Sequence, residues 1–221
     1  MSKDKKNTLI VVGILFIAVI IILFLENGTR VLVDEKYEDL TGIVIDSDLA
    51  DIEVKYIRAL DVNVLVYGRK NDNIEYYEDE NILYMYKKST RGFCMVNCND
   101  KIILYLPEKF QYINIKTDMG KLDLNEVEFD KALISSSVGD ISIGKVHEVD
   151  ITSDIGNVTI ERIDGTSDSS IITKSGSVKI KNTSNLDIDA ETYTGKKDIK
   201  KTKDNEFTLK VKTDTGSIKV G

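Results

Sequence analysis

Four aspartates recur at one position of a repeated pattern and could bind a cation together. Each lies two residues before a glycine, or before Ala50 in the first copy: Asp48, Asp118, Asp154 and Asp214. Stacked carboxylates could share calcium, which takes oxygen ligands from several residues. However, Ser137, Lys174 and Tyr193 occupy this position in other copies, and the glycine-rich nonapeptide of calcium-binding β-rolls is absent. We therefore favour the alternative, in which these aspartates hydrogen-bond the backbone of a turn.

Few other residues have the types and spacing that catalysis or metal binding requires. His147 is the single histidine, which excludes a zinc site built on two imidazoles. Cys94 and Cys98, in "GFCMVNC", could form a local disulfide outside the cytoplasm or remain free thiols, and they lack the second pair of ligands that zinc needs. We expect no catalytic residues, no cofactor and no metal.

The pattern around the aspartates is an internal repeat. Segments such as "IKTDMGKLDL" and "ITSDIGNVTI" place aliphatic residues alternately on both sides of a glycine, with Ser or Thr three residues before it. Alternation predicts two short strands, and the glycine predicts a tight bend between them. Copies about twenty residues apart are typical of a β-solenoid. We predict an all-β stack of short strands with these structural turn glycines: Gly120, Gly139, Gly156, Gly176, Gly195 and Gly216.

The region before the repeats predicts longer strands joined by hairpins. Segments 61–68, 73–88, 101–107 and 111–117 alternate apolar and polar residues, and "RKND" and "EDEN" are suitable hairpin turns. Tyrosines are concentrated here, and we treat Tyr76, Tyr84 and Tyr86 as a candidate interaction surface for carbohydrate. The simpler interpretation is that these tyrosines fill the core, because exposure rather than number marks a binding surface.

A lysine cluster interrupts the weakest repeat and is a second candidate surface. It lies in "GKKDIKKTKDN" and consists of Lys196, Lys197, Lys200, Lys201 and Lys203. Such a cluster could bind an anionic wall polymer or lipid headgroups, although charge runs are often only solvated loops.

The N-terminus predicts a membrane anchor. Residues 8–25 are almost entirely apolar, follow three lysines, and precede no small-residue cleavage site. The expected organisation is a cytoplasmic N-terminus (1–7), a transmembrane signal anchor (8–25), a linker and first strand (26–39), and an extracytoplasmic domain (40–221). A cleaved, secreted form is the alternative. The total charge is −7 and residues 1–25 carry +2, so the remainder carries −9, which disfavours nucleic-acid binding.

The segment "KIILYLPEKFQYINIKTDMGKLDL", followed by glycine-centred repeats, resembles the bacterial putative-adhesin domain of unknown function. That family includes LiaG-like membrane-anchored envelope proteins. The resemblance covers roughly residues 40–221 and implies a β-solenoid fold and an envelope location. It implies no catalytic residues, and adhesion receives no independent support from this sequence.

Two classes of function follow from these features. The first is a non-enzymatic, membrane-anchored scaffold or adhesin-like interaction module of the bacterial cell envelope, with a role in envelope-stress response as one option. The second is a polysaccharide-active β-helix enzyme, which would need several carboxylates converging in a groove; a weak calcium- or wall-polymer-binding module is a further alternative. Expected partners are the membrane, envelope proteins, wall polymer, or a second copy. The last would bind through an uncapped C-terminal edge at "SIKVG", where Lys210, Lys212 and Lys219 would discourage pairing.

Overall fold

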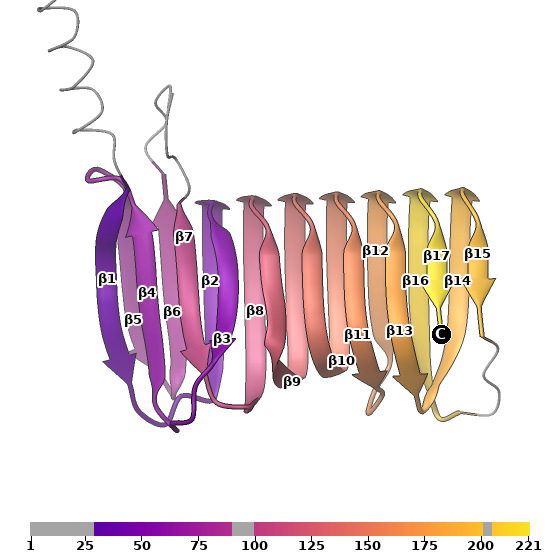
Figure 1. Ribbon diagram of the computed structural model, residues 1–221, viewed down its shortest axis with the longest axis horizontal. Coiled ribbons are helices and arrows are strands. Elements are labelled where there is room, and N and C mark those ends of the chain that lie inside the picture. Colours follow the sequence, from indigo (N-terminus) through magenta and orange to yellow (C-terminus); the bar gives the residue numbers. More distant parts are fainter. Residues whose placement is uncertain (1–28, 90–99, 201–204) are drawn as a thin grey trace, which may run out of the picture.

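The computed structural model describes residues 29–89, 100–200 and 205–221, and these residues form an elongated all-β stack (Figure 1). They contain seventeen strands and no helix, so these ranges hold no helix able to cross a bilayer. The all-β solenoid predicted from the glycine repeat is confirmed. The predicted anchor, residues 8–25, lies outside the described residues.

One layer of the stack contains the strands that lead into the glycine corners. All its neighbouring pairs are parallel except the first, which is an antiparallel hairpin. Its order is β5 (Asn73–Asp79), β6 (Ile82–Lys88), β2 (Gly42–Leu49), β8 (Lys109–Met119), β9 (Leu122–Val138), β10 (Ile141–Ile155), β12 (Ser169–Ser175), β16 (Phe207–Thr215) and β14 (Leu186–Thr194).

The second layer contains the strands that leave the corners. The long strands β9 and β10 run through both layers, so their first halves belong here. The order is β1 (Arg30–Tyr37), β4 (Val62–Gly68), β7 (Lys101–Leu106), β3 (Asp51–Tyr56), β9, β10, β11 (Val158–Asp164), β13 (Val178–Ser184), β17 (Ile218–Val220) and β15 (Lys197–Ile199).

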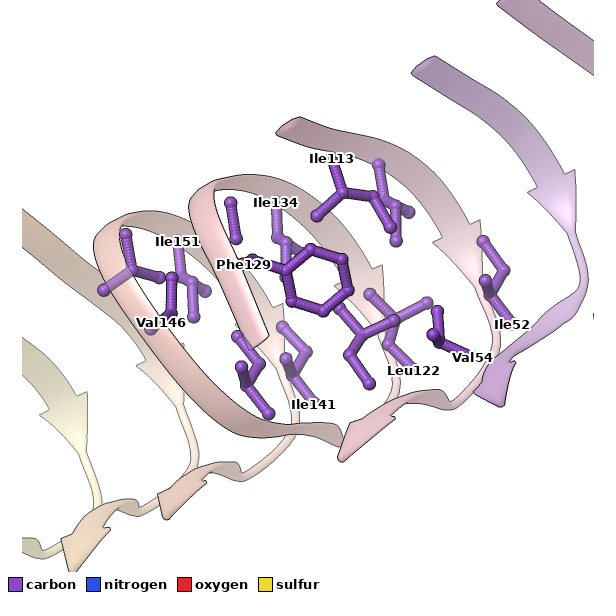
Figure 2. Packing of buried hydrophobic residues seen from close by; sticks show 14 of the residues in the cluster. Ile52, Val54, Ile113, Leu122, Phe129, Ile134, Ile141, Val146 and Ile151 are labelled. Carbon is purple, nitrogen blue, oxygen red and sulfur yellow. The ribbon is translucent and has the colours of Figure 1, made fainter. Parts of the chain in front are cut away.

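The core lies between the layers because inward positions of successive coils fall in register. Ile115, Ile134 and Ile151 pair along the first layer, and Ile52, Leu122 and Ile141 along the second. Figure 2 shows the two rows facing each other, with Phe129 between them. All seven side chains are buried. Period-two alternation thus fills one continuous core, and the hydrophobic effect holds each coil to the next.

The glycine corners require glycine because successive corners are stacked closely. The six corner glycines have φ between 149° and 158°. A Cβ atom on any of them would lie 1.9–2.0 Å from the carbonyl oxygen of the neighbouring corner. Ala50 occupies the first corner and is not among the described residues with positive φ. In the neighbouring coil, the segment between β6 and β7 includes residues 90–99, which lie outside the described residues.

The hairpin expectation holds for one turn and fails for the other. Glu80 and Asn81 have φ of 49° and 62° and join β5 to β6 in a type I′-like turn. "RKND" also forms a turn, in which the Asp72 N–H donates to the Arg69 carbonyl at 3.1 Å. However, β4 and β5 do not pair with each other; they belong to different layers. This turn is therefore a crossover between layers.

The C-terminal strand is not the open edge that the sequence order suggested. The last coil, β16–β17, lies between β12–β13 on one side and β14–β15 on the other. After Ile199 the chain returns and inserts its final coil beneath the preceding one. Among the described residues, the end of the stack opposite β1 and β5 is therefore β14–β15, and the expectation of a free edge at "SIKVG" is wrong about its position.

Candidate functional site

The turn aspartates have different partners: Asp48 Oδ1 accepts the Ser89 backbone N–H at 2.8 Å, whereas Asp154 does not have the role that its spacing suggested. Asp154 forms an ion pair with Lys174 in the next coil at 2.7 Å. The corner backbone is instead bonded by the residue directly after the glycine position: Asp140 Oδ1 accepts the Asn157 N–H at 2.8 Å, and Asn157 Oδ1 accepts the Ser177 N–H at 3.0 Å. The turn interpretation of Asp154 is thus wrong, because its strand position points it outward. Among the described residues, no group of three or more His, Cys, Asp or Glu is arranged to hold a metal ion.

A column of hydroxyl side chains lies just inside the corners. Its members pair in register along the first layer and are buried, except the half-buried terminal Thr192. In spatial order they are Ser47, Thr117, Ser136, Ser153, Thr173, Thr213 and Thr192. These small residues fit the narrow space beneath the corner, so their role is architectural.

Lys87 continues this column at its N-terminal end, where it pairs with Ser47. Its ammonium lies 2.5 Å from Asp100 Oδ2 and 3.3 Å from Asp72 Oδ2, and all three side chains are fully buried. Ser89 Oγ accepts a hydrogen bond from Lys87 at 2.8 Å and donates one to Asp100 at 2.7 Å. Such burial is tolerated only because the charges are paired and hydrogen-bonded. The network joins Ser89 and Asp100, the two described residues on either side of 90–99.

The alternation of residues along β6 predicts that Lys87 points inward, although lysine is rarely buried. Lys87 follows Leu83 and Met85 at intervals of two, which is the inward set of β6. Cys94 and Cys98 lie in residues 90–99, outside the described residues, so their disulfide stays a prediction.

The tyrosines separate onto two faces of the β5–β6 hairpin. Tyr77 and Tyr84 are cross-strand partners with ring centroids 5.0 Å apart, and Tyr86 lies 6.4 Å from Tyr77. The Tyr86 hydroxyl raises the pKa of Tyr77. Tyr76 faces the other way, with its hydroxyl 3.4 Å from Glu35 of β1. The stacked cluster is therefore Tyr77, Tyr84 and Tyr86, of which Tyr77 and Tyr86 are exposed and Tyr84 is half-buried, while Tyr76 is exposed on the other face. The hairpin register adds Tyr77 to the predicted surface and separates Tyr76 from it.

The lysine cluster lies at the open end of the stack. Lys197 begins the edge strand β15 and donates to the Ala190 carbonyl at 3.1 Å. Lys196 and Lys200 flank this strand and are exposed, whereas Lys201 and Lys203 lie outside the described residues. Lysines on an edge strand discourage pairing with another chain. This gives the three described lysines a structural role that needs no ligand.

His147 belongs to an ion-pair network on the side of the stack away from the corners. Its Nε2 lies 2.8 Å from Glu128, and Lys145 bridges Glu128 and Asp164 at 3.1 and 3.3 Å. Burial acts to raise the pKa of Glu128, but hydrogen bonds from His147 and Lys145 outweigh it and leave the pKa lowered. The pKa of Asp164 is lowered in the same way, since hydrogen bonds from Ser184, Arg162 and Lys145 outweigh burial. The network joins successive coils electrostatically.

A shallow hollow of about 250 Å³ on the second layer also gathers carboxylates. Asp51, Glu53 and Asp123 line it with Lys101 and Lys121. Lys101 pairs with Glu53 and lowers its pKa, and the Lys121 backbone N–H donates to Asp51 Oδ1 at 2.8 Å. Glu53 is therefore ionised and paired near neutral pH, an arrangement that suits a surface ion pair better than a general acid.

The first described residues lie at the glycine-corner edge. Arg30 pairs with Gly68 at the end of β4, and the adjacent Tyr67 pairs with Lys101 at the start of β7. Lys101 in turn pairs with Asp51, which directly follows the Ala50 corner. The chain thus enters the stack level with the corners, as Figure 1 shows at the top of β1.

These pairings define a two-layered parallel β-solenoid whose coils turn at a ladder of glycines. Residues 40–221 match the Toastrack DUF4097 family. The chain belongs to this family, in agreement with the resemblance found in the sequence. The chain matches no curated protein.

Solved structures with a similar fold have low sequence identity. One is a putative cell adhesion protein from Clostridium sporogenes ATCC 15579, at 12% identity over 86% of this chain and 99% of that chain, with a TM-score of 0.49. Another is a putative adhesin from Bacteroides fragilis NCTC 9343, at 17% identity over 87% and 96%, with a TM-score of 0.35. Similarity at this level transfers no function.

Proposed function

We propose that the protein is a membrane-anchored, extracytoplasmic scaffold or adhesin-like interaction module of the bacterial cell envelope, and that it is not an enzyme. Residues 1–7 would be cytoplasmic, residues 8–25 would span the membrane, and the Toastrack domain would project outside. The observation that carries the proposal is the position of Arg30: the chain enters a rigid stack at one edge, directly after an apolar segment of transmembrane length.

The long lateral faces of the stack are better suited to binding another molecule than to catalysis. Successive coils share one core and one register, so the lateral faces are long and fixed. Carboxylates on these faces are matched by cations, as in the Glu53–Lys101 and Glu148–Lys131 pairs, which lower the pKa of both glutamates. Faces of this kind provide binding area without a nucleophile or a raised-pKa acid.

The anchor is tested by membrane extraction of the full chain. Wild-type protein should remain in the membrane pellet after an alkaline carbonate wash. The double variant Ile14→Asp, Ile17→Lys should move to the supernatant, because each charge costs roughly 2.5–3.5 kcal/mol at the centre of a spanning helix. The double variant Ile14→Leu, Ile17→Leu is the matched control and should stay in the pellet. Recovery of the wild type in the supernatant would refute the anchor.

A further inference from the structure

We propose that the glycine-corner edge rests on the same lipid surface that the N-terminal segment enters, with an apolar row inserted into the headgroup region. This inference rests on the proposed anchor. The row consists of Met119, Val138 and Ile155, each the residue directly before a corner glycine, and we call it the rim row.

The rim row is contiguous and unusually exposed. Met119 pairs with Val138, and Val138 pairs with Ile155, so the three side chains follow one another along three coils. Their exposed fractions are 52%, 38% and 56%. Isolated apolar side chains on a surface need no explanation, but an aligned row marks a contact surface.

The rim changes character along the stack. In the coils beyond Ile155 the same position holds Ser175, Thr215 and Thr194, in register with the rim row. The apolar half of the rim is therefore the half closer to β1, where the chain enters. Anchoring at one end would bring this half closest to the bilayer.

The chain leaves little distance between the anchor and the edge. Only residues 26–28 separate the apolar segment from Thr29, a reach of roughly 10 Å even when fully extended. Between β1 and the first half of β9 lie β4, β7 and β3, which puts the start of the rim row about 19 Å along the edge at ordinary strand spacing. Because the tether is this short, the membrane that holds the anchor lies close to the rim row and can supply an apolar environment for its side chains.

The charges beside the row indicate which lipid it prefers. Four acids border the row against two nearby cations, Lys121 and Lys174. Asp118 and Asp154 directly precede Met119 and Ile155, and the exposed Asp51 and Asp140 directly follow the corner positions. With acids this close, an anionic surface repels the edge, and a zwitterionic surface does not. We expect insertion to weaken as anionic lipid is added.

The chain has no tryptophan, so a single introduced tryptophan reports depth without background. The reporter is Ile155→Trp. The control is Leu60→Trp, because Leu60 is 84% exposed and follows the far end of β3, at the opposite edge. Full-length protein is reconstituted into phosphatidylcholine vesicles containing brominated phosphatidylcholine, and into matched vesicles with added phosphatidylglycerol. Circular dichroism confirms that each variant is folded.

The expected result is strong quenching and a blue-shifted emission for Ile155→Trp, with neither for Leu60→Trp. Adding Met119→Glu and Val138→Glu to the reporter should remove the quenching, and phosphatidylglycerol should reduce it. Equal, weak quenching at both positions, with the protein still in the carbonate-washed vesicles, would overturn the edge contact while leaving the anchor intact. A concentration-dependent blue shift without quenching would instead assign the row to a second copy. Loss of the protein from washed vesicles would refute the anchor itself.

Discussion

The corner glycines are predicted to be the least replaceable residues outside the buried core, and Gly156→Ala tests this. A Cβ at Gly156 would lie 2.0 Å from the Gly139 carbonyl oxygen. Reaching an ordinary contact of about 3.4 Å requires a shift of about 1.4 Å. This shift would lengthen the two backbone bonds that join these corners, Gly139 N–H to Ile155 O at 2.9 Å and Ile141 N–H to Asn157 O at 2.8 Å, beyond bonding range.

The expected loss combines two terms. A non-glycine residue held at a φ of 152° costs about 1–3 kcal/mol. Two weakened backbone hydrogen bonds add roughly 1–3 kcal/mol together. Gly156→Ala should therefore lower the free energy of unfolding by about 2–6 kcal/mol, measured by urea unfolding of the full chain in detergent and followed by circular dichroism.

The chain provides its own control at the first corner. Ala50 is not among the described residues with positive φ, so Ala50→Gly should cost only about 0.5–1 kcal/mol through backbone entropy. If Gly156→Ala cost less than about 1 kcal/mol, or no more than Ala50→Gly, the corner-stacking argument would be refuted.

Three other predictions concern charges. Lys87→Met should destabilise the fold by about 3–5 kcal/mol because it removes the buried cation that faces the Asp100 carboxylate, and adding Asp100→Asn should recover part of the loss in the same unfolding assay. Hydrogen bonds from His147 and Lys145 lower the pKa of Glu128 from 4.5 despite burial, so its contribution to stability is present above pH 4.5 and is lost as the pH falls through the lowered folded value. Glu128→Gln should therefore reduce the loss of stability that the wild type shows below pH 4.5. Asp154→Asn should change the free energy of unfolding by less than about 1 kcal/mol, because it removes only a surface ion pair. Calcium should stabilise neither the wild type nor this variant. If calcium stabilised the wild type alone, the stacked aspartates would bind it after all.

The repeated features of the fold can be predicted from the sequence, because a pattern that is weak in one copy becomes clear when six copies share it. Six glycines with alternating aliphatic residues identify the two-strand coil, and Gly120 to Gly216 all lie at corners. The order of the coils was not predictable in this way. The final coil inserts before β14–β15, and nothing in the local pattern distinguishes a coil added at the end from one inserted beneath it.

Features that depend on partners from other coils were the least accessible to sequence reasoning. Asp154 was assigned to its own turn, but its partner Lys174 is supplied by the neighbouring coil. Tyr76 and Tyr77 are adjacent in sequence, and only the hairpin register decides which one joins Tyr84. Lys87 was overlooked because a buried lysine is rare, although its alternation with Met85 placed it inward.

The most direct test of the proposed function is the side of the membrane on which the Toastrack domain lies. A single cysteine is introduced by Thr166→Cys, at an exposed position between β11 and β12, in a chain with Cys94→Ser and Cys98→Ser. Intact bacterial cells expressing this chain are treated with a membrane-impermeant maleimide. An extracytoplasmic domain predicts complete labelling without permeabilisation. Labelling only after permeabilisation would place the domain in the cytoplasm and contradict the proposal.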